Sequence, residues 1–338
     1  MAIQRASVMT SVPGIVQREN TLSDARNMLF RRGFDQAREA YILFPLLAVL
    51  LLLVTWAGTL YLIKVEQARA QQGIAEASLE IGATYEAQIL RAVREIDQTL
   101  KLVKYTYESE REPNPLPKLK ARALLPSPYL FDVSVVDAGG RVVASTQPSE
   151  AGSWMAKDAL KTLAPDTALS ISRPWKSPVT GEWKLRFSRR LEGGDGAFAG
   201  IAMVEVDAAY FVSSYDPSKL GNHGLLGLLG IDGVFRARRS GEAVSAGDPI
   251  DYASVVPDTE NTDAVRSINA WDDVRRYTSA RQLYDFPLAV IVGLSEEEQL
   301  AAVTRQARTY LWRTAAGSRA PEVGARLPGH RGQLFFFG

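Results

Sequence analysis

Six residues in the middle of the chain combine side-chain chemistries that suit the binding of a small zwitterion. They are Arg173, Trp175, Trp183, Phe187, Arg189 and Glu205. A guanidinium can hold a carboxylate through two parallel hydrogen bonds. An indole ring can form a wall against an apolar or cationic group, and a glutamate can receive an amine. The residue types therefore predict a ligand-binding site.

The spacing of these residues suggests how a fold would present them. The first arginine and the first tryptophan of the set stand two apart, in a loop expected after a short strand. Trp183, Phe187 and Arg189 are separated by even numbers, so they would project from one face of the next strand. Glu205 closes the strand after that. The structural alternative is that the tryptophans are core residues and that Arg173 forms a salt bridge.

The composition offers little for catalysis, for metals or for nucleic acid. The chain has no cysteine and only two histidines, His223 and His330, which excludes thiol catalysis, disulfides and cysteine-bound metals. No His/Glu spacing suits zinc and no Ser–His–Asp set is apparent. The net charge is +1, from 39 basic and 38 acidic residues, which is not the basic balance of a nucleic-acid-binding protein. We predict no enzyme activity, no metal, no cofactor and no nucleic-acid partner.

Residues 41–63 (YILFPLLAVLLLLVTWAGTLYLI) form an uncharged run that predicts a transmembrane helix. At about 1.5 Å per residue the run exceeds the hydrocarbon core of a bilayer, about 30 Å. Pro45 would lie in its first turn. Six arginines precede the run, whereas Lys64 and Arg69 follow it, and an arginine excess marks the cytoplasmic side. A cleaved signal peptide fits less well, because the run is long and begins late. We expect a single-pass protein of a bacterial inner membrane, with a cytoplasmic arm over residues 1–40 and a periplasmic body.

Residues 64–112 show a heptad-like pattern that predicts a stalk helix. The pattern is interrupted at Gln72, Gly82 and Glu86. The seam needs a partner, which could be a second copy of the chain or the body of the same chain. We favour a homodimer contact near the membrane and leave both partners open for the distal half. The apolar residues in register are Val65, Ala68, Ala75, Leu79, Ile89, Val93, Ile96, Leu100, Val103 and Tyr107.

Beyond Pro128 the apolar pattern changes to a period of two, which predicts two successive sheet units. The second ends in a helix that would begin after Ser295, with Glu298 closing a capping box, and run to about Trp312. The expected strands of the first unit are residues 131–146 (a hairpin), 169–172, 183–191 and 198–206, followed by a short helix at 207–215. Those of the second unit are 225–231, 234–238, 275–282 and 286–293.

Several segments, taken in this order, resemble the double Cache sensors of bacterial chemoreceptors, histidine kinases and diguanylate cyclases. The segments are FDVSVVDAGGRVVAST, Ile171 to Phe211, Leu220 to Gly241 and FPLAVIVGLSEEE. The resemblance implies an α+β fold in which a long transmembrane and stalk helix precedes two tandem PAS-like units with central antiparallel sheets. The membrane-distal unit would span residues 113–215, the proximal unit 216–295 and an exit helix 296–312.

The resemblance also implies a ligand. Amino-acid-sensing Cache domains carry an Arg-x-Trp pair followed downstream by an acidic residue. Arg173-Pro174-Trp175 matches the pair, and Glu205 lies roughly where the acid is expected. The tyrosine expected beside the tryptophan is Lys176 here. The implied ligand is an amino acid or another small carboxylate.

Family members normally continue through a second span to an output domain. Residues 313–338 are rich in Arg, Gly and Pro, so we expect a disordered tail and a receptor truncated before that span. The predicted function is a periplasmic ligand sensor that passes a signal along its stalk helices. The alternative is a membrane-anchored assembly protein of the envelope or of a secretion complex, for which a pocket around Arg173 would be unnecessary.

Overall fold

The computed structural model separates into two compact units, Glu66–Arg305 and a second unit formed by Met1–Val65 with Gln306–Gly338. The structure describes residues 16–110, 114–127, 129–147, 152–155, 160, 168–213, 215–256 and 263–324.

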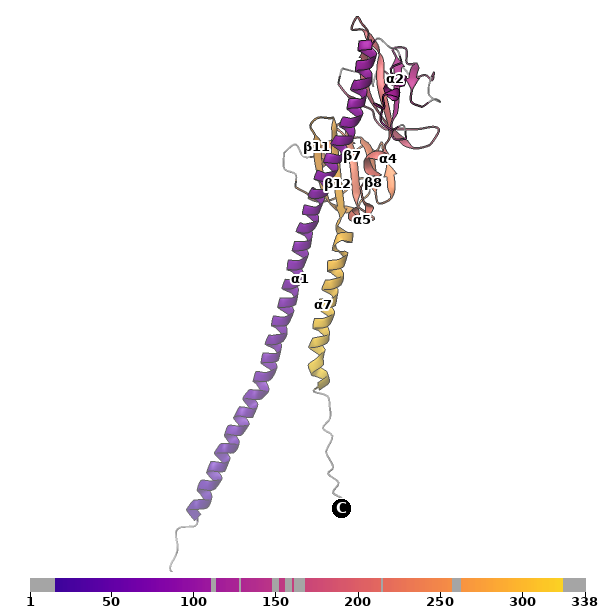
Figure 1. The fold of residues 1–338 in the computed structure, drawn as a ribbon. Helices are drawn as coiled ribbons and strands as arrows, with labels where there is room; N and C mark the ends of the chain where they lie inside the picture. Colours follow the sequence, from indigo (N-terminus) through magenta and orange to yellow (C-terminus); the bar gives the residue numbers. More distant parts are fainter. Residues whose placement is uncertain are drawn as a thin grey trace, which may run out of the picture. The chain divides into compact units, whose positions relative to one another are not determined.

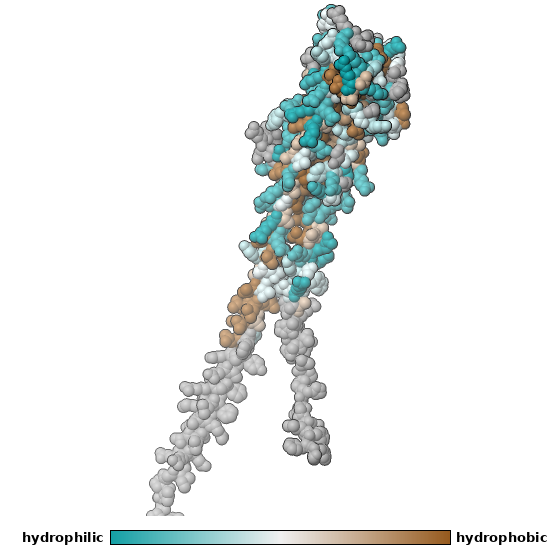
Figure 2. Space-filling model, viewed as in Figure 1, coloured by the Kyte–Doolittle hydropathy of each residue, from teal (hydrophilic) through white to brown (hydrophobic). Residues whose placement is uncertain are grey.

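A single helix, α1 (Val16–Glu110), contains both the predicted span and the predicted stalk (Figure 1). It begins well before residue 41, so Pro45 lies inside the helix and not in its first turn. Among the described residues, α1 is the one helix long and apolar enough to cross a membrane. Leu47, Leu50 and Leu53 are exposed, and Figure 2 shows apolar residues around this part of α1. An apolar surface of this kind is the one that lipid tails can cover.

Helix α7 is longer than predicted. Its residues from Gln306 onward belong to the unit that contains Met1–Val65. The helix spans Glu296–Gly324, so the expected end at Trp312 is wrong and residues 313–324 are helical rather than disordered. Arginine and alanine are good helix formers, and they continue the helix past Trp312. Within the same unit, the hydroxyl oxygens of Thr314 and Thr59 lie 3.3 Å apart. The remainder of the predicted tail, residues 325–338, lies outside the described residues.

The first sheet of the unit Glu66–Arg305 has the strand order β2-β1-β6-β5-β3, with β4 also paired to β5, and every printed pairing is antiparallel. It contains the strands predicted for the first sheet unit. The elements are α2 (Leu116–Ala121), β1 (Asp132–Asp137), β2 (Val142–Ser145), β3 (Ser170–Ile171), β4 (Trp175–Lys176), β5 (Trp183–Glu192), β6 (Phe198–Asp207), α4 (Ala209–Ser213) and α5 (Pro217–Leu220).

The second sheet has the order β10-β11-β12-β7-β8-β9 and is also antiparallel. Its two edge strands were not predicted, because each is short and neither alternates apolar and polar residues clearly. The elements are β7 (Leu225–Gly230), β8 (Phe235–Ser240), β9 (Ala243–Ser245), α6 (Tyr252–Val255), β10 (Val265–Ile268), β11 (Arg275–Leu283) and β12 (Leu288–Ser295). The α+β architecture with two tandem sheet units is confirmed.

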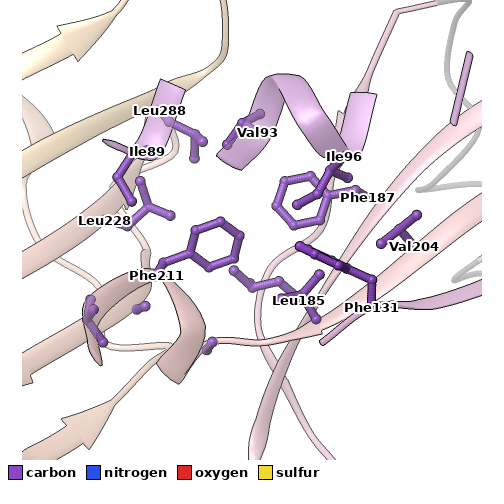
Figure 3. Close-up of a cluster of buried hydrophobic side chains, with 14 of the residues drawn as sticks. Ile89, Val93, Ile96, Phe131, Leu185, Phe187, Val204, Phe211, Leu228 and Leu288 are labelled. Atoms are coloured by element: carbon purple, nitrogen blue, oxygen red, sulfur yellow. The ribbon is translucent and has the colours of Figure 1, made fainter. Parts of the chain in front are cut away.

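Between Ile74 and Val103, the stalk part of α1 packs on both sheets of its own chain. Ile89, Val93 and Ile96 are at most 1% exposed, and Figure 3 shows them among side chains from both sheets. The body of the same chain therefore covers the distal half of the seam. Nearer the N-terminal end of this stretch, Ile74, Ile81 and Tyr85 are the buried apolar residues, and not the predicted Ala75 and Leu79.

Two predicted interruptions of the seam are the points where α1 crosses β11. An ideal Cβ added to Gly82 would lie 2.9 Å from Ser279 Oγ, so the absent side chain allows a close approach. Glu86 Oε2 accepts a hydrogen bond from Arg281 Nη1 at 3.2 Å. Contact with β11 therefore accounts for the small residue at position 82 and the acidic residue at position 86.

The predicted capping box at the start of α7 is replaced by a longer-range contact. The Glu298 carboxylate accepts the backbone N–H groups of Asn222 and His223, at 3.1 Å each. These N–H groups belong to the loop that leads into β7. Glu298 therefore joins the first turn of α7 to that loop.

Candidate functional site

The face of the first sheet that turns away from α1 carries a buried group of charged side chains. Val204 and Phe187 pack in the core with α1. Successive side chains of a strand point to opposite faces, so Glu205 and Arg186 project from the other face. Glu205 pairs in register with Arg186 on one side and with Asp132 on the other. The register therefore places the three side chains next to one another.

Glu205 is the centre of this group, which we call the distal cluster: Asp132, Ser134, Trp175, Lys184, Arg186 and Glu205. The carboxylate of Glu205 is 4% exposed and lies 2.9 Å from Arg186 Nε and 3.2 Å from Lys184 Nζ. Lys184 Nζ is also 3.8 Å from Asp132 Oδ2, and Gln147 Nε2 donates to the same oxygen at 3.0 Å. Buried charges are tolerated when they are paired in this way.

Trp175 joins the cluster through Arg186. The guanidinium carbon of Arg186 lies 4.0 Å from the centre of the Trp175 ring, a cation–π contact. The Ser172 hydroxyl accepts the backbone N–H of Arg186 at 2.9 Å. The loop that carries Trp175 is therefore fixed to β5 at two points.

Two polar atoms of the cluster are buried without a hydrogen-bond partner. They are the indole Nε1 of Trp175 and the hydroxyl Oγ of Ser134, and Ser134 is only 2% exposed. Nearly all buried polar groups in proteins have a partner. Ser134 lies on β1 opposite Met203 and Trp175 lies on β4 opposite Lys184, so the two atoms mark separate points on the same face of the sheet.

Burial and the neighbouring charges act in opposite directions on the pKa values of Asp132 and Lys184. Burial raises the pKa of Asp132, and the nearby ammonium of Lys184 offsets this only in part. Burial acts to lower the pKa of Lys184, but attraction to Glu205, Asp207 and Asp132 outweighs it and raises that pKa. The lysine is therefore held firmly in its charged form.

An apolar patch lies next to the cluster on the same face. Ile201 and Met203 of β6 are buried there with Leu160, and Met155 packs against them. Leu160 and Met155 belong to the segment between β2 and β3. Part of that segment therefore covers this face of the sheet.

Of the six residues predicted for the site, the structure brings Trp175 and Glu205 together, with Arg186 between them. Arg173 lies elsewhere: its side chain is 69% exposed, and its Nε donates to Asp232 Oδ2 at 2.9 Å. Trp183 packs partly against the core, with its ring 3.5 Å from the position of an ideal Cβ on Gly247.

Phe187 and Arg189 point towards α1, on the opposite face from Glu205. Phe187 is fully buried, with its ring centre 5.8 Å from that of Phe211. Arg189 Nε donates to Asp97 Oδ1 of α1 at 2.6 Å. The predicted residues on strands are thus divided between the two faces of the first sheet, and Arg173 lies in a loop that contacts Asp232.

Arg186 and Lys184 were missed because the prediction followed the aromatic residues of β5. The hairpin register does not reveal this pair from sequence alone. Counting back from Glu192 opposite Phe198 would place Arg186 opposite Val204, but the register shifts by one residue between Leu191 and Glu192. This irregularity brings Arg186 opposite Glu205, where opposite charges across neighbouring strands interact directly.

Among the residues described by the structure, no group of three or more His, Cys, Asp or Glu side chains could hold a metal ion. The distal cluster consists of ion pairs, hydrogen bonds and one indole ring.

Comparison with solved structures identifies the fold. The extracellular domain of a protein described as a histidine kinase, rpHK1S-Z16, has a TM-score of 0.54 and 20% sequence identity, covering 69% of this chain and 97% of that domain. The periplasmic sensory domain of the Campylobacter jejuni chemoreceptor Tlp1 has a TM-score of 0.47 and 11% identity, over 68% and 98% of the two chains. No family model and no curated protein matches the sequence. The chain shares the fold of the rpHK1S-Z16 extracellular domain, and its two tandem antiparallel sheet units agree with the fold that the resemblance implied.

Proposed function

We propose that the chain is the ligand-sensing part of a membrane-anchored signal-transduction receptor. The observation that carries the proposal is the buried, unpartnered indole Nε1 of Trp175, on a ring that lies against Arg186 and beside the Glu205 carboxylate that Arg186 binds. An indole N–H donates a hydrogen bond, so a ligand with an acceptor oxygen would satisfy it. The double Cache fold supports a sensor role for the domain that carries this cluster.

The charges of the cluster favour a small carboxylate, such as an amino acid. Arg186 and Lys184 can attract its carboxylate, and Glu205 and Asp132 can attract an amine. In the structure these four side chains neutralise one another. A ligand must therefore replace an internal pair, which favours a ligand that carries both charges. Trp175 and Glu205 are the predicted residues that we place in this site.

The same proposal covers the membrane arrangement. Residues 41–63 would span the inner membrane, with the arginine-rich N-terminus in the cytoplasm and the sheets in the periplasm. Homodimerisation through α1 would involve the side of the helix that the sheets leave open. Ala87, Leu90 and Arg91 line a shallow groove there.

A thermal-shift screen of amino and organic acids on the detergent-purified full chain tests the ligand. Calorimetry on any hit then compares Glu205→Gln and Trp175→Phe with the parent. Losing a charged hydrogen-bond partner costs about 1.5–3 kcal/mol, so Glu205→Gln should weaken binding by roughly ten- to a hundredfold.

Trp183→Phe is the control, because that tryptophan begins β5, the strand that carries Lys184 and Arg186, but packs against the core and Gly247. It should bind the hit as the parent does. Unchanged affinity in Glu205→Gln would show that the ligand binds elsewhere. If no acid shifts the melting temperature of the parent, the assembly-protein alternative is favoured.

A further inference from the structure

The loop beside the distal cluster makes a charged contact with the second sheet. Arg173 lies between β3 and β4, and its Nε donates to Asp232 Oδ2 at 2.9 Å. Asp232 belongs to the turn between β7 and β8. The two residues are 59 positions apart in the sequence, and both lie in the compact unit Glu66–Arg305. This ion pair therefore links the two sheet units directly.

Asp232 is a fixed acceptor for this contact. Its other oxygen, Oδ1, accepts Arg236 Nη1 at 2.8 Å and the backbone N–H of Val234 at 3.3 Å. The Arg236 side chain is 7% exposed, so it is held inside the hairpin. A displacement of Arg173 would thus act on a carboxylate that is bound to the start of β8, at the turn of one hairpin.

On the other side, Arg173 is closely tied to the distal cluster. Ser172, one residue before it, accepts the backbone N–H of Arg186. Trp175, two residues after it, stacks on the guanidinium of the same arginine. Pro174 between them restricts φ to about −65°. A change at Arg186 therefore reaches Arg173 through a segment with little freedom to absorb it.

A second contact lies next to the ion pair. An ideal Cβ on Gly247 would lie 3.5 Å from the Trp183 ring and 3.8 Å from Pro174 Cγ. Gly247 also donates its N–H to the Phe235 carbonyl at 2.9 Å, so it belongs to the same part of the second sheet. This packing is a second direct contact between the loop of Arg173 and the second sheet.

We propose that the Arg173–Asp232 ion pair transmits the state of the distal cluster to the β7–β8 hairpin. Strand β7 pairs with β12 along six residue pairs, and β12 leads directly into α7. Arg173 is then a positioning residue that couples two sites, and not a ligand contact.

Amide hydrogen exchange on the full chain in detergent tests this coupling without any ligand. Glu205→Gln disturbs the distal cluster, and exchange is followed in peptides covering residues 225–240. An exposed ion pair is a weak interaction, so we expect exchange in these peptides to rise by about two- to fivefold. In the Arg173→Ala background the same substitution should leave their exchange unchanged.

Arg94→Ala is the matched background. Arg94 also forms an exposed ion pair, with Asp285, but it lies on α1, and its ion pair among the described residues does not involve residues 172–175. The response of residues 225–240 to Glu205→Gln should persist there. Trp175→Phe is a second, milder disturbance of the cluster and should show the same dependence on Arg173.

An equal response with and without Arg173 would overturn the proposal. So would an unchanged hairpin in the parent background when peptides covering residues 172–188 do respond. Because no small molecule is added, the result is independent of whether the cluster binds a carboxylate.

Discussion

The guanidinium of Arg186 lies 4.0 Å from the centre of the Trp175 ring. The same arginine donates from Nε to Glu205 at 2.9 Å. One side chain thus covers the indole face and neutralises the buried acid. In the proposed site, a ligand that approaches Trp175 would have to displace Arg186 or bind beside it, so we expect both stability and the proposed binding to depend on Arg186.

Arg186→Ala should lower the free energy of unfolding by about 1–3 kcal/mol, because Glu205 stays buried with Lys184 as its remaining cationic partner. Urea unfolding of the full chain in detergent, followed by tryptophan fluorescence, measures the change. Arg190→Ala is the control: Arg190 lies on the same face of β5 over the Phe198 ring at 5.1 Å and should cost at most about 1 kcal/mol. Equal losses in the two variants would contradict the role of Arg186.

Asp97→Asn should weaken the attachment of α1 to the first sheet. Burial acts to raise the pKa of Asp97, but hydrogen bonds from Arg189 and Lys101 outweigh it and hold that pKa below its ordinary value of 3.8. A lowered carboxyl pKa stabilises the fold above the unfolded value, and this contribution is lost as the pH falls through the folded value. We expect a loss of about 1–3 kcal/mol at pH 7.

The difference between Asp97→Asn and the parent should therefore shrink as the pH falls from about 5 towards 2. Urea unfolding at pH 7 and pH 3 measures it. Glu95→Gln, an exposed position on the same helix, should stay within about 0.5 kcal/mol of the parent at both pH values. A difference for Asp97→Asn that grows on acidification would reverse the sign argued above.

Two glycines of α1 should respond in opposite directions to alanine. An added Cβ at Gly73 meets nothing within 4 Å, so Gly73→Ala should stabilise the helix by about 0.5–1 kcal/mol. At Gly82 the Cβ would lie 2.9 Å from Ser279 Oγ. That hydroxyl donates to the Ser78 carbonyl at 2.9 Å, so it is not free to move.

Gly82→Ala should therefore destabilise the chain, because crowding in a packed interface costs about 1–3 kcal/mol and exceeds the gain in helix propensity. Thermal unfolding of the two variants side by side measures both effects. A stabilising Gly82→Ala would mean that α1 and β11 are less closely packed in solution.

Membrane topology can be tested with reporter fusions. Alkaline phosphatase fused after Pro113 should be active, since this enzyme needs the oxidising periplasm. A fusion after Arg38 should be inactive. A cytoplasmic reporter that is active after Pro113 would invert the proposed orientation.

The membrane segment and the long hairpins follow from local sequence. An uncharged, apolar run of bilayer length is most stable inside a membrane, because exposing its leucines to water is unfavourable and it carries no charge that lipid would have to solvate. Strands β5 and β6 follow from alternation and from the glycine-rich turn between them, although their register also depends on the irregularity between Leu191 and Glu192. These features depend on residues close together in the chain, so their position could be predicted.

The partner of the stalk helix could not be decided in this way. The heptad pattern predicts that Ile89, Val93 and Ile96 pack against an apolar surface, but that surface could belong to a second helix or to a sheet. The tertiary structure supplies both sheets as the partner. It also explains Gly82 and Glu86, which interrupt the heptads because β11 crosses there.

Likewise, local sequence could not predict which residues form the distal cluster. Arginine at 173 and tryptophan at 175 form one motif in the sequence, yet the fold directs Arg173 to Asp232 and Trp175 to Arg186. The choice depends on β4 pairing with β5 over two residue pairs and on the second sheet lying against the loop. Contacts between segments far apart in the chain form only when the whole core packs, so the tertiary structure alone selects the guanidinium that faces the indole.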